Sequence, residues 1–210
     1  MAVKVLIVDD HAIIRDGLRA ILEASDDIAV VGSAADGREA VRMAAAAGPD
    51  VVIMDIAMPG LNGIEAIRIL GERLPATATL VLSMHNTGEH IHRALAAGAR
   101  GYLLKESAGA EVVAAVRAVS RGALYFGRNV DRPVGKAHRQ KSPLESLSSR
   151  EREVLQLVVE GSTSAAIAQR LALSPKSVET YRSRIMHKLA VKDVPSLVKF
   201  AIANGITPPA

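Results

Sequence analysis

Short apolar runs alternate with helix-like segments along the first 122 residues. The runs Val3–Val8, Ile28–Val31, Val51–Met54, Leu80–Leu82 and Tyr102–Leu104 are almost continuously apolar, which is typical of strands that are buried on both faces. Between and after them, apolar residues recur at spacings of three and four, and this spacing predicts five amphipathic helices. The alternation predicts an α/β domain in which helices cover both faces of a parallel five-stranded sheet.

Polar residues stand directly after four of these apolar runs. Asp9 and Asp10 follow the first run, Asp55 the third, Ser83 the fourth and Lys105 the fifth. Because ligands bind at the carboxyl ends of the strands in an open α/β sheet, we expect three carboxylates, a hydroxyl and an ammonium to meet at one edge. Such a set suits Mg²⁺ together with phosphate oxygens, and a carboxylate nucleophile that forms an aspartyl-phosphate.

Helical periodicity replaces this alternation after residue 146. It predicts a first helix that ends at Gly161, a second over Thr163–Leu171, a third from Pro175 to about Leu189 and a fourth over about Val194–Asn204. Serines stand at the expected N-cap positions of the first and third helices. A three-residue turn joins the second helix to the basic third helix, and this arrangement predicts a helix-turn-helix within a small all-α domain.

The charge distribution supports a division into two domains. The 210 residues carry a net charge of +4, but residues 1–122 hold 12 basic and 15 acidic residues, whereas residues 123–210 hold 14 basic and 7 acidic residues. The stretch Gly127–Ser149 lacks sustained apolar periodicity and is rich in Pro, Gly, Ser and basic residues, which indicates an exposed linker. We therefore expect domains at 1–122 and 147–210, joined by a linker at 123–146.

Composition excludes several classes of protein. With 49% apolar residues the chain can bury a core, and without cysteine it has neither disulfides nor thiolate zinc sites. Aromatic residues make up only 2%, too few for nucleic-acid binding by base stacking.

No apolar run reaches the roughly 18–20 residues of a membrane helix, so we expect no membrane partner. The absence of cysteine fits the reducing cytoplasm, where we expect the protein to act. His85, His90 and His92 are expected to be solvated helix residues.

Four segments, in order and at suitable spacing, resemble the receiver domain of two-component response regulators. They are KVLIVDDH (Lys4–His11), DIAMPGLNG (Asp55–Gly63), VLSMH (Val81–His85) and GYLLK (Gly101–Lys105). The resemblance covers roughly residues 1–122 and implies a flavodoxin-like (βα)5 fold.

This resemblance also implies roles for individual residues. Asp55 would be the phosphoacceptor. Mg²⁺ would be held by Asp10, Asp55 and the backbone carbonyl of Ala57, with Asp9 acting through water. Ser83 and Lys105 would contact the phosphoryl group, and Tyr102 occupies the position of the switch aromatic.

The segments Ser149–Gly161 and Ile167–Leu189 resemble the LuxR-type helix-turn-helix domain of NarL/FixJ response regulators. By this resemblance, base edges of double-stranded promoter DNA would be faced by Glu179, Thr180 and Ser183. The phosphodiester would be engaged by Lys176, Arg184 and Lys188, with Arg182 at the rim. The resemblance also implies dimer contacts on the last helix, through Val194, Leu197, Val198 and Ala201. Alternatively, this face closes the domain core.

Together these features favour a transcription regulator controlled by a histidine kinase that phosphorylates Asp55. We expect a homodimer in the phosphorylated or DNA-bound state, and no enzymatic activity beyond self-phosphotransfer and self-dephosphorylation at Asp55. One alternative is a phosphorylation-independent DNA-binding protein whose receiver serves only as an interaction module. Another is a phosphatase acting on external substrates, although no nucleophile-elbow, Walker-type or dinucleotide-binding motif is present.

Overall fold

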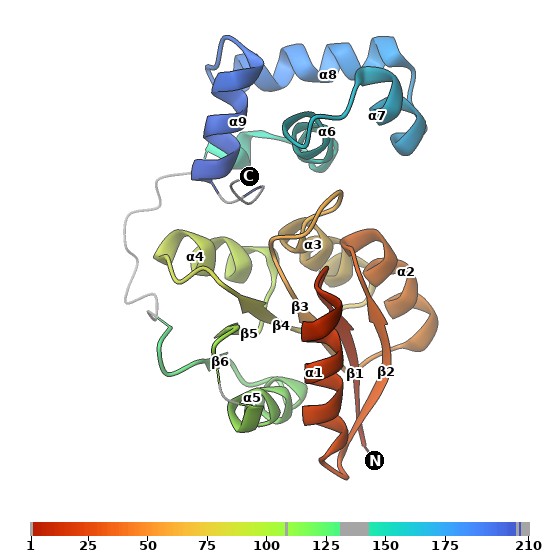
Figure 1. The fold of residues 1–210 in the computed structure, drawn as a ribbon, viewed down its shortest axis with the longest axis vertical. Helices are drawn as coiled ribbons and strands as arrows, with labels where there is room; N and C mark the ends of the chain where they lie inside the picture. Colours follow the sequence, from red (N-terminus) through yellow and green to blue (C-terminus); the bar gives the residue numbers. More distant parts are fainter. Residues whose placement is uncertain (1, 108, 131–142, 205, 207–210) are drawn as a thin grey trace. The chain divides into compact units, whose positions relative to one another are not determined.

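The computed structural model describes residues 2–107, 109–130, 143–204 and 206. The chain divides into two compact units, Met1–Gly135 and Lys136–Ala210, and each is described by itself (Figure 1). Residues 131–142 of the predicted linker lie outside the described residues, as do residues 205 and 207–210 of the predicted second domain.

The first unit is built on a parallel sheet. Its strand order is β2-β1-β3-β4-β5-β6, and every neighbouring pair is parallel. The order of the first five strands is that of flavodoxin-like folds, in which each parallel pairing needs a crossover helix. The strands are β1 (Val3–Val8), β2 (Ile28–Ala34), β3 (Val51–Met54), β4 (Ala78–Ser83), β5 (Gly101–Leu104) and β6 (Tyr125–Phe126).

Five helices cover both faces of this sheet. One core layer contains buried residues of α1 and α5, and the other contains buried residues of α2, α3 and α4. The two groups of helices therefore lie on opposite faces of the sheet (Figure 1). Because both faces are covered, the inner strands are apolar along most of their length. The predicted doubly covered parallel sheet is therefore confirmed. The helices are α1 (Ala12–Glu23), α2 (Gly37–Ala47), α3 (Gly63–Arg73), α4 (Gly88–Ala97) and α5 (Gly109–Ser120).

The sheet has six strands, and not the five that the sequence predicted. The sixth strand, β6, pairs with β5 through Gly101↔Tyr125 and Tyr102↔Phe126. It is only two residues long, so it carries no apolar pattern from which a strand could be predicted. Val130, four residues further on, is buried in the core layer of this unit. Part of the range predicted as a linker is therefore folded onto the first unit.

The second unit is helical, as predicted. Its core joins buried side chains from every helix, among them Leu155, Ile167, Ile185 and Leu197. The predicted caps are present, because Ser148 forms a capping box with Glu151 and the Ser174 side chain accepts from the N–H of Ser177. The elements are the 3-10 helix η1 (Pro143–Ser146) and the α-helices α6 (Ser149–Val159), α7 (Ser164–Leu171), α8 (Pro175–Lys188) and α9 (Val194–Ala203).

The helix η1 was not predicted. It begins inside the range assigned to the linker, and its residue Leu144 is buried in the core of the second unit. Among the described residues, no helix combines the length and the apolar character that crossing a membrane requires.

A close backbone approach fixes the loop between β3 and α3. Asn62 caps α3 by accepting from the N–H of Glu65 at 3.0 Å. At the next position, a Cβ added to Gly63 would lie 2.0 Å from the carbonyl oxygen of Asp55 and 2.8 Å from Ile56 Cα. Because neither backbone atom can move without displacing the end of β3, only glycine fits this position.

We expect Gly63→Ala to lower the melting temperature, because the methyl group would push α3 away from β3. The matched control is Gly71→Ala in the same helix, where an added Cβ would meet nothing within 4 Å. That variant should gain about 0.5–1 kcal/mol, since alanine restricts the unfolded chain more than glycine does. Thermal unfolding measures both changes, and equal effects of the two substitutions would contradict the close approach.

Candidate functional site

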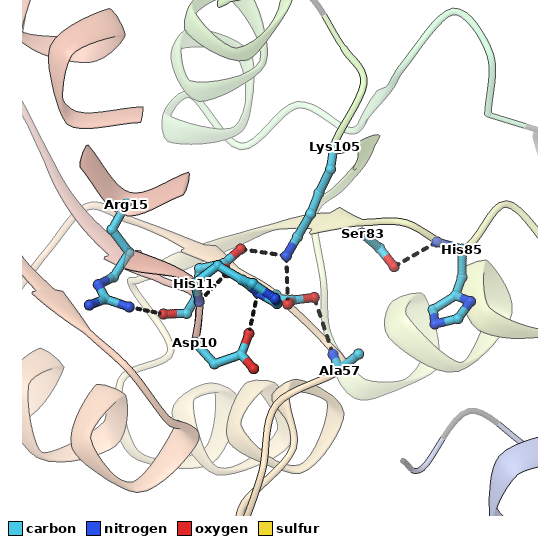
Figure 2. A network of polar contacts seen from close by, with 9 residues as sticks. Asp10, His11, Arg15, Ala57, Ser83, His85 and Lys105 are labelled. Atoms are coloured by element: carbon cyan, nitrogen blue, oxygen red, sulfur yellow. Dashed lines mark hydrogen bonds and ion pairs between the residues drawn. The ribbon is translucent and has the colours of Figure 1, made fainter. Parts of the chain in front are cut away.

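A buried ammonium group lies between two buried carboxylates at the carboxyl edge of the sheet. Lys105 follows β5, and its Nζ lies 2.6 Å from Asp9 Oδ2 and 2.8 Å from Asp55 Oδ2. Figure 2 shows the Lys105 side chain reaching into this cluster. Asp9 and Asp55 follow β1 and β3, and both are almost fully buried. Asp55 lies 46 positions after Asp9 and 50 positions before Lys105 in the sequence. The structure brings the three residues together at the sheet edge that the strand pattern predicted.

The protonation of this cluster follows from burial and from the paired charges. Burial raises the pKa of Asp55, and the Asp9 charge adds to this effect, whereas the Lys105 ammonium and the N–H of Ala57 oppose it. Burial alone would lower the pKa of Lys105, but its two carboxylate partners outweigh that cost and raise it. The lysine therefore stays cationic, and the Asp55 carboxylate depends on it for compensation.

Asp10 and His11 complete the acidic pocket. His11 Nδ1 lies 2.8 Å from Asp10 Oδ1 and 3.2 Å from Asp9 Oδ1. Asp10 Oδ1 is buried and accepts no hydrogen bond from the described residues. One ligand atom from each of Asp9, Asp10, His11 and Asp55 lies within 4.8 Å of the others. Carboxylate oxygens gathered at this spacing suit a hard divalent cation.

Two backbone contacts shape the pocket. The N–H of Ala57 donates to Asp55 Oδ1 at 3.1 Å, so the residue predicted to offer its carbonyl reaches the site through its N–H. Arg15 Nη1 donates to the backbone carbonyl of Asp9 at 2.7 Å. Both contacts hold a carboxylate-bearing loop in place (Figure 2).

Ser83 and Tyr102 both contact the loop that follows β4. The Ser83 hydroxyl accepts from the N–H of His85 at 3.1 Å, and the Tyr102 hydroxyl donates to the carbonyl of His85 at 2.7 Å. Both side chains are fully buried. Burial raises the pKa of Tyr102 to about 12, so the phenol remains a hydrogen-bond donor at physiological pH.

The same loop contacts the segment that follows β6. Asn86 Nδ2 donates to the carbonyl of Asn129 at 2.7 Å, and the N–H of Gly127 donates to the carbonyl of Tyr102 at 3.0 Å. The loop after β4 therefore connects the acidic pocket with the last described residues of the first unit. The sequence pattern carried no sign of this connection.

The expectation of solvated helix residues was wrong for His85, which lies partly buried in the loop before α4, and for His90. Its side chain is buried on α4, its ring stacks on that of His85 at a centroid distance of 4.5 Å, and Thr87 Oγ1 lies 2.6 Å from its Nδ1. Burial lowers the pKa of His90 to about 4. The burial of His90 could have been predicted from the sequence. His90 precedes Ile91 and lies four positions before Ala94, which places it on the apolar stripe of α4.

In the second unit, α8 presents one polar face to solvent. Val178 and Ile185 are fully buried on the opposite face. The predicted DNA contacts are placed accordingly, since Arg182 is half-buried and the others are exposed, namely Lys176, Glu179, Thr180, Ser183, Arg184 and Lys188. An exposed basic helix that follows a short turn has the geometry of a recognition helix.

Comparisons with known proteins decide the family. Residues 5–117 match the response regulator receiver domain, and residues 145–201 match the bacterial regulatory proteins of the luxR family. The chain is 36% identical to the transcriptional regulatory protein MctR of Rhizobium johnstonii over 97% of this chain and 95% of that one. It is 38% identical to the oxygen regulatory protein NreC of Staphylococcus carnosus over 97% and 98%. The chain belongs to the NarL/FixJ family of two-component response regulators.

A solved structure adds to this assignment. The two-component response regulator RcsB in complex with DNA matches with a TM-score of 0.61 and 28% identity, over 95% of this chain and 98% of that one. The protein is thus a response regulator with a receiver domain and a LuxR-type DNA-binding domain.

Within the LuxR-type domain, Glu179 is held by partners of its own unit. Arg182 Nη1 lies 2.9 Å from Ser164 Oγ and 3.4 Å from Glu179 Oε1, and the Ser164 hydroxyl donates to Glu179. Sequence reasoning missed Ser164, because its link to α8 spans a turn. This network joins α7 to α8 and orients the carboxylate predicted to face DNA bases.

Lys188 also has partners inside the domain. Its Nζ lies 2.7 Å from the buried Glu151 Oε2 and 3.0 Å from the carbonyl of Ser146. Burial would raise the pKa of Glu151, but Lys188 and the Ser148 cap lower it. In this structure Lys188 thus fastens η1 and α6 to α8.

The predicted dimer face on α9 is divided. Leu197 and Ala201 are buried in the core of the domain, whereas Val194 and Val198 are partly exposed. For the first two residues, the structure shows the alternative role of closing the core.

We expect Asp55→Asn to raise the melting temperature of the metal-free response regulator at neutral pH. Because the folded-state pKa of Asp55 is raised above its ordinary 3.8, ionisation of Asp55 costs stability as the pH rises above that value. The gain should therefore shrink on acidification. Thermal unfolding in chelator across the pH range tests this, with Asp16→Asn on the exposed face of α1 as control. A gain independent of pH would contradict the assignment.

Proposed function

We propose that this response regulator is a transcription regulator switched by phosphorylation of Asp55 by a histidine kinase. The observation that carries the proposal is the buried Asp55 carboxylate, which is held at 2.8 Å by Lys105 beside two further carboxylates at one sheet edge. Phosphoryl transfer depends mainly on positioning and charge neutralisation, and this cluster supplies both.

The cation of this site is proposed to be Mg²⁺. Asp10, Asp55 and the backbone carbonyl of Ala57 would hold it, with Asp9 acting through water. The gathering of ligand atoms from Asp9, Asp10 and Asp55 within 4.8 Å of one another supports this set. When bound, the ion would neutralise charge on the phosphoryl oxygens.

Asp55, Lys105 and Ala57 would have different roles in the phosphoryl transfer. A carboxylate oxygen of Asp55 attacks the phosphorus of a phosphohistidine, the phosphorus–nitrogen bond breaks, and the histidine leaves with the electron pair. Lys105 neutralises charge on the transferred group, and the N–H of Ala57 orients the carboxylate. Attack of water on the aspartyl-phosphate reverses the modification, so self-phosphotransfer and self-dephosphorylation would be the only chemistry.

The signal would leave the site through the loop after β4. A phosphoryl group on Asp55 offers a stronger acceptor charge than the carboxylate, and it would draw the Ser83 hydroxyl away from the N–H of His85. The loop would then move relative to Tyr102 and Asn129, which now hold it through hydrogen bonds of 2.7 Å each. Asn129 lies within the predicted linker range, in the part that is folded onto the first unit, so the change would reach the linker range.

The output would be paired binding to promoter DNA. Residues 151–210 hold 8 basic and 5 acidic residues, a modest charge for a DNA reader, so one domain alone would bind weakly. A homodimer formed on phosphorylation would occupy two half-sites and gain affinity from the linkage. The solved RcsB–DNA complex supports this role. Access to promoters also implies a cytoplasmic location.

We expect acetyl phosphate to tighten DNA binding of the wild-type chain by at least about tenfold, equal to about 1.4 kcal/mol. Asp55→Asn should abolish this response, because an amide cannot accept the phosphoryl group. A footprinting titration with and without acetyl phosphate measures both. If acetyl phosphate tightens DNA binding of Asp55→Asn as much as that of the wild type, Asp55 is not the switch. If it does not change DNA binding of the wild type, the phosphorylation-independent regulator is favoured.

We expect Arg184→Ala on α8 to weaken DNA binding and to reduce the slope of log K against log salt concentration by about 1, the contribution of one phosphate contact. The control is Lys199→Ala, which removes an exposed cation from α9 and should leave the slope unchanged. If both variants keep the wild-type slope, α8 does not contact phosphates through Arg184.

A further inference from the structure

We propose that Ser164 and Arg182 position the carboxylate of Glu179 to accept from the amino group of a cytosine, so that α8 prefers a G·C pair at one position of each half-site. The inference rests on the DNA-binding role in the proposed function. It names the base that one side chain reads, and it gives a role to Ser164, to which the sequence pattern assigned none.

The contacts around Glu179 converge on one of its two carboxylate oxygens. The Ser164 hydroxyl donates to Glu179 Oε1, and Arg182 Nη1 lies 3.4 Å from the same oxygen. Arg182 Nη1 also donates to Ser164 Oγ at 2.9 Å. Because a hydroxyl has one proton to donate and a guanidinium cannot accept, the direction of each hydrogen bond in this network is fixed.

The other carboxylate oxygen of Glu179, Oε2, takes no part in this network. The Glu179 side chain is 60% exposed, although Oε1 is held by two partners. Oε2 is thus the atom with which Glu179 accepts from a ligand that approaches the polar face of α8.

The chemistry of the base edges selects cytosine. A carboxylate accepts hydrogen bonds but cannot donate them. In the major groove, where a recognition helix lies, amino donors are offered by cytosine N4 and adenine N6. Adenine places the acceptor N7 beside its amino group, and this acceptor repels a carboxylate, whereas the cytosine edge has no such acceptor. A carboxylate held on α8 therefore favours cytosine, and with it a G·C pair.

The network lowers the cost of using a flexible acidic side chain against DNA. Ordering a glutamate side chain on binding reduces affinity. Here two helices order Glu179 before DNA is bound, because Ser164 is the first residue of α7 and Arg182 lies three positions further along α8. Arg182 also offsets the negative charge that the DNA phosphates would repel.

Selection of binding sites from double-stranded DNA with a randomised central segment tests the inference. The full chain is treated with acetyl phosphate, and the bound DNA is sequenced. Wild type should select a G·C pair at one position of each half-site, and Glu179→Ala should lose the preference at that position alone. Ser164→Ala and Arg182→Ala should reduce the preference at the same position by about tenfold, near the lower end of the cost of a mismatched base pair.

Two further serine variants separate positioning from a general effect on the fold. Ser164→Thr keeps the hydroxyl and should keep the preference. Ser162→Ala removes a hydroxyl from the segment just before α7 and should leave the preference unchanged. If Ser164→Ala lowers the affinity for all sequences equally and leaves the base preference as it is, Ser164 has only a structural role and the inference is overturned.

Failure of this inference can be told apart from failure of the proposed function. If wild type selects sites in which no position depends on Glu179, the DNA-binding role stands and the reading of cytosine by Glu179 is wrong. If wild type enriches no sequence from the pool, the DNA-binding role itself fails, and the inference fails with it.

Discussion

The ion pairs of Lys105 with Asp9 and Asp55 are the interaction on which the rest of the receiver domain depends. Parallel strands end at a common edge, and here that edge collects three carboxylates, two of them almost fully buried. Buried charges of one sign are costly unless they are paired. The ammonium at 2.6 and 2.8 Å meets part of this cost and leaves a net negative pocket, which a cation and a phosphoryl group can occupy in turn.

The loop after β4 is the proposed route by which a change at Asp55 would leave the site. Its backbone is held at His85 by the buried hydroxyls of Ser83 and Tyr102, and its Asn86 reaches the segment after β6. The short strand β6 fastens that segment to the sheet edge. Through these hydrogen bonds, a change of charge at Asp55 would reach residues 125–130, the folded part of the predicted linker range.

Much of the fold followed from local patterns, because strands buried on both faces and capped amphipathic helices leave strong signals. The acidic pocket could also be located from the sequence, because polar residues directly follow strands whose carboxyl ends share one edge of the sheet. What escaped prediction depends on contacts between distant segments. The two-residue strand β6 has no pattern of its own, Ser164 reaches Glu179 only across a turn, and Lys188 pairs with Glu151 from another helix. Such pairings are decided by tertiary packing rather than by periodicity.

The central claim is that the carboxylate compensated by Lys105 is the group that accepts phosphate. Treatment of the full chain with acetyl phosphate and Mg²⁺, reduction by borohydride and peptide mass spectrometry locates the acyl phosphate directly, because reduction converts the modified aspartate to homoserine. The account predicts homoserine at Asp55 and at no other carboxylate. Homoserine at Asp9 or Asp10, or no conversion in the wild-type chain, would contradict it.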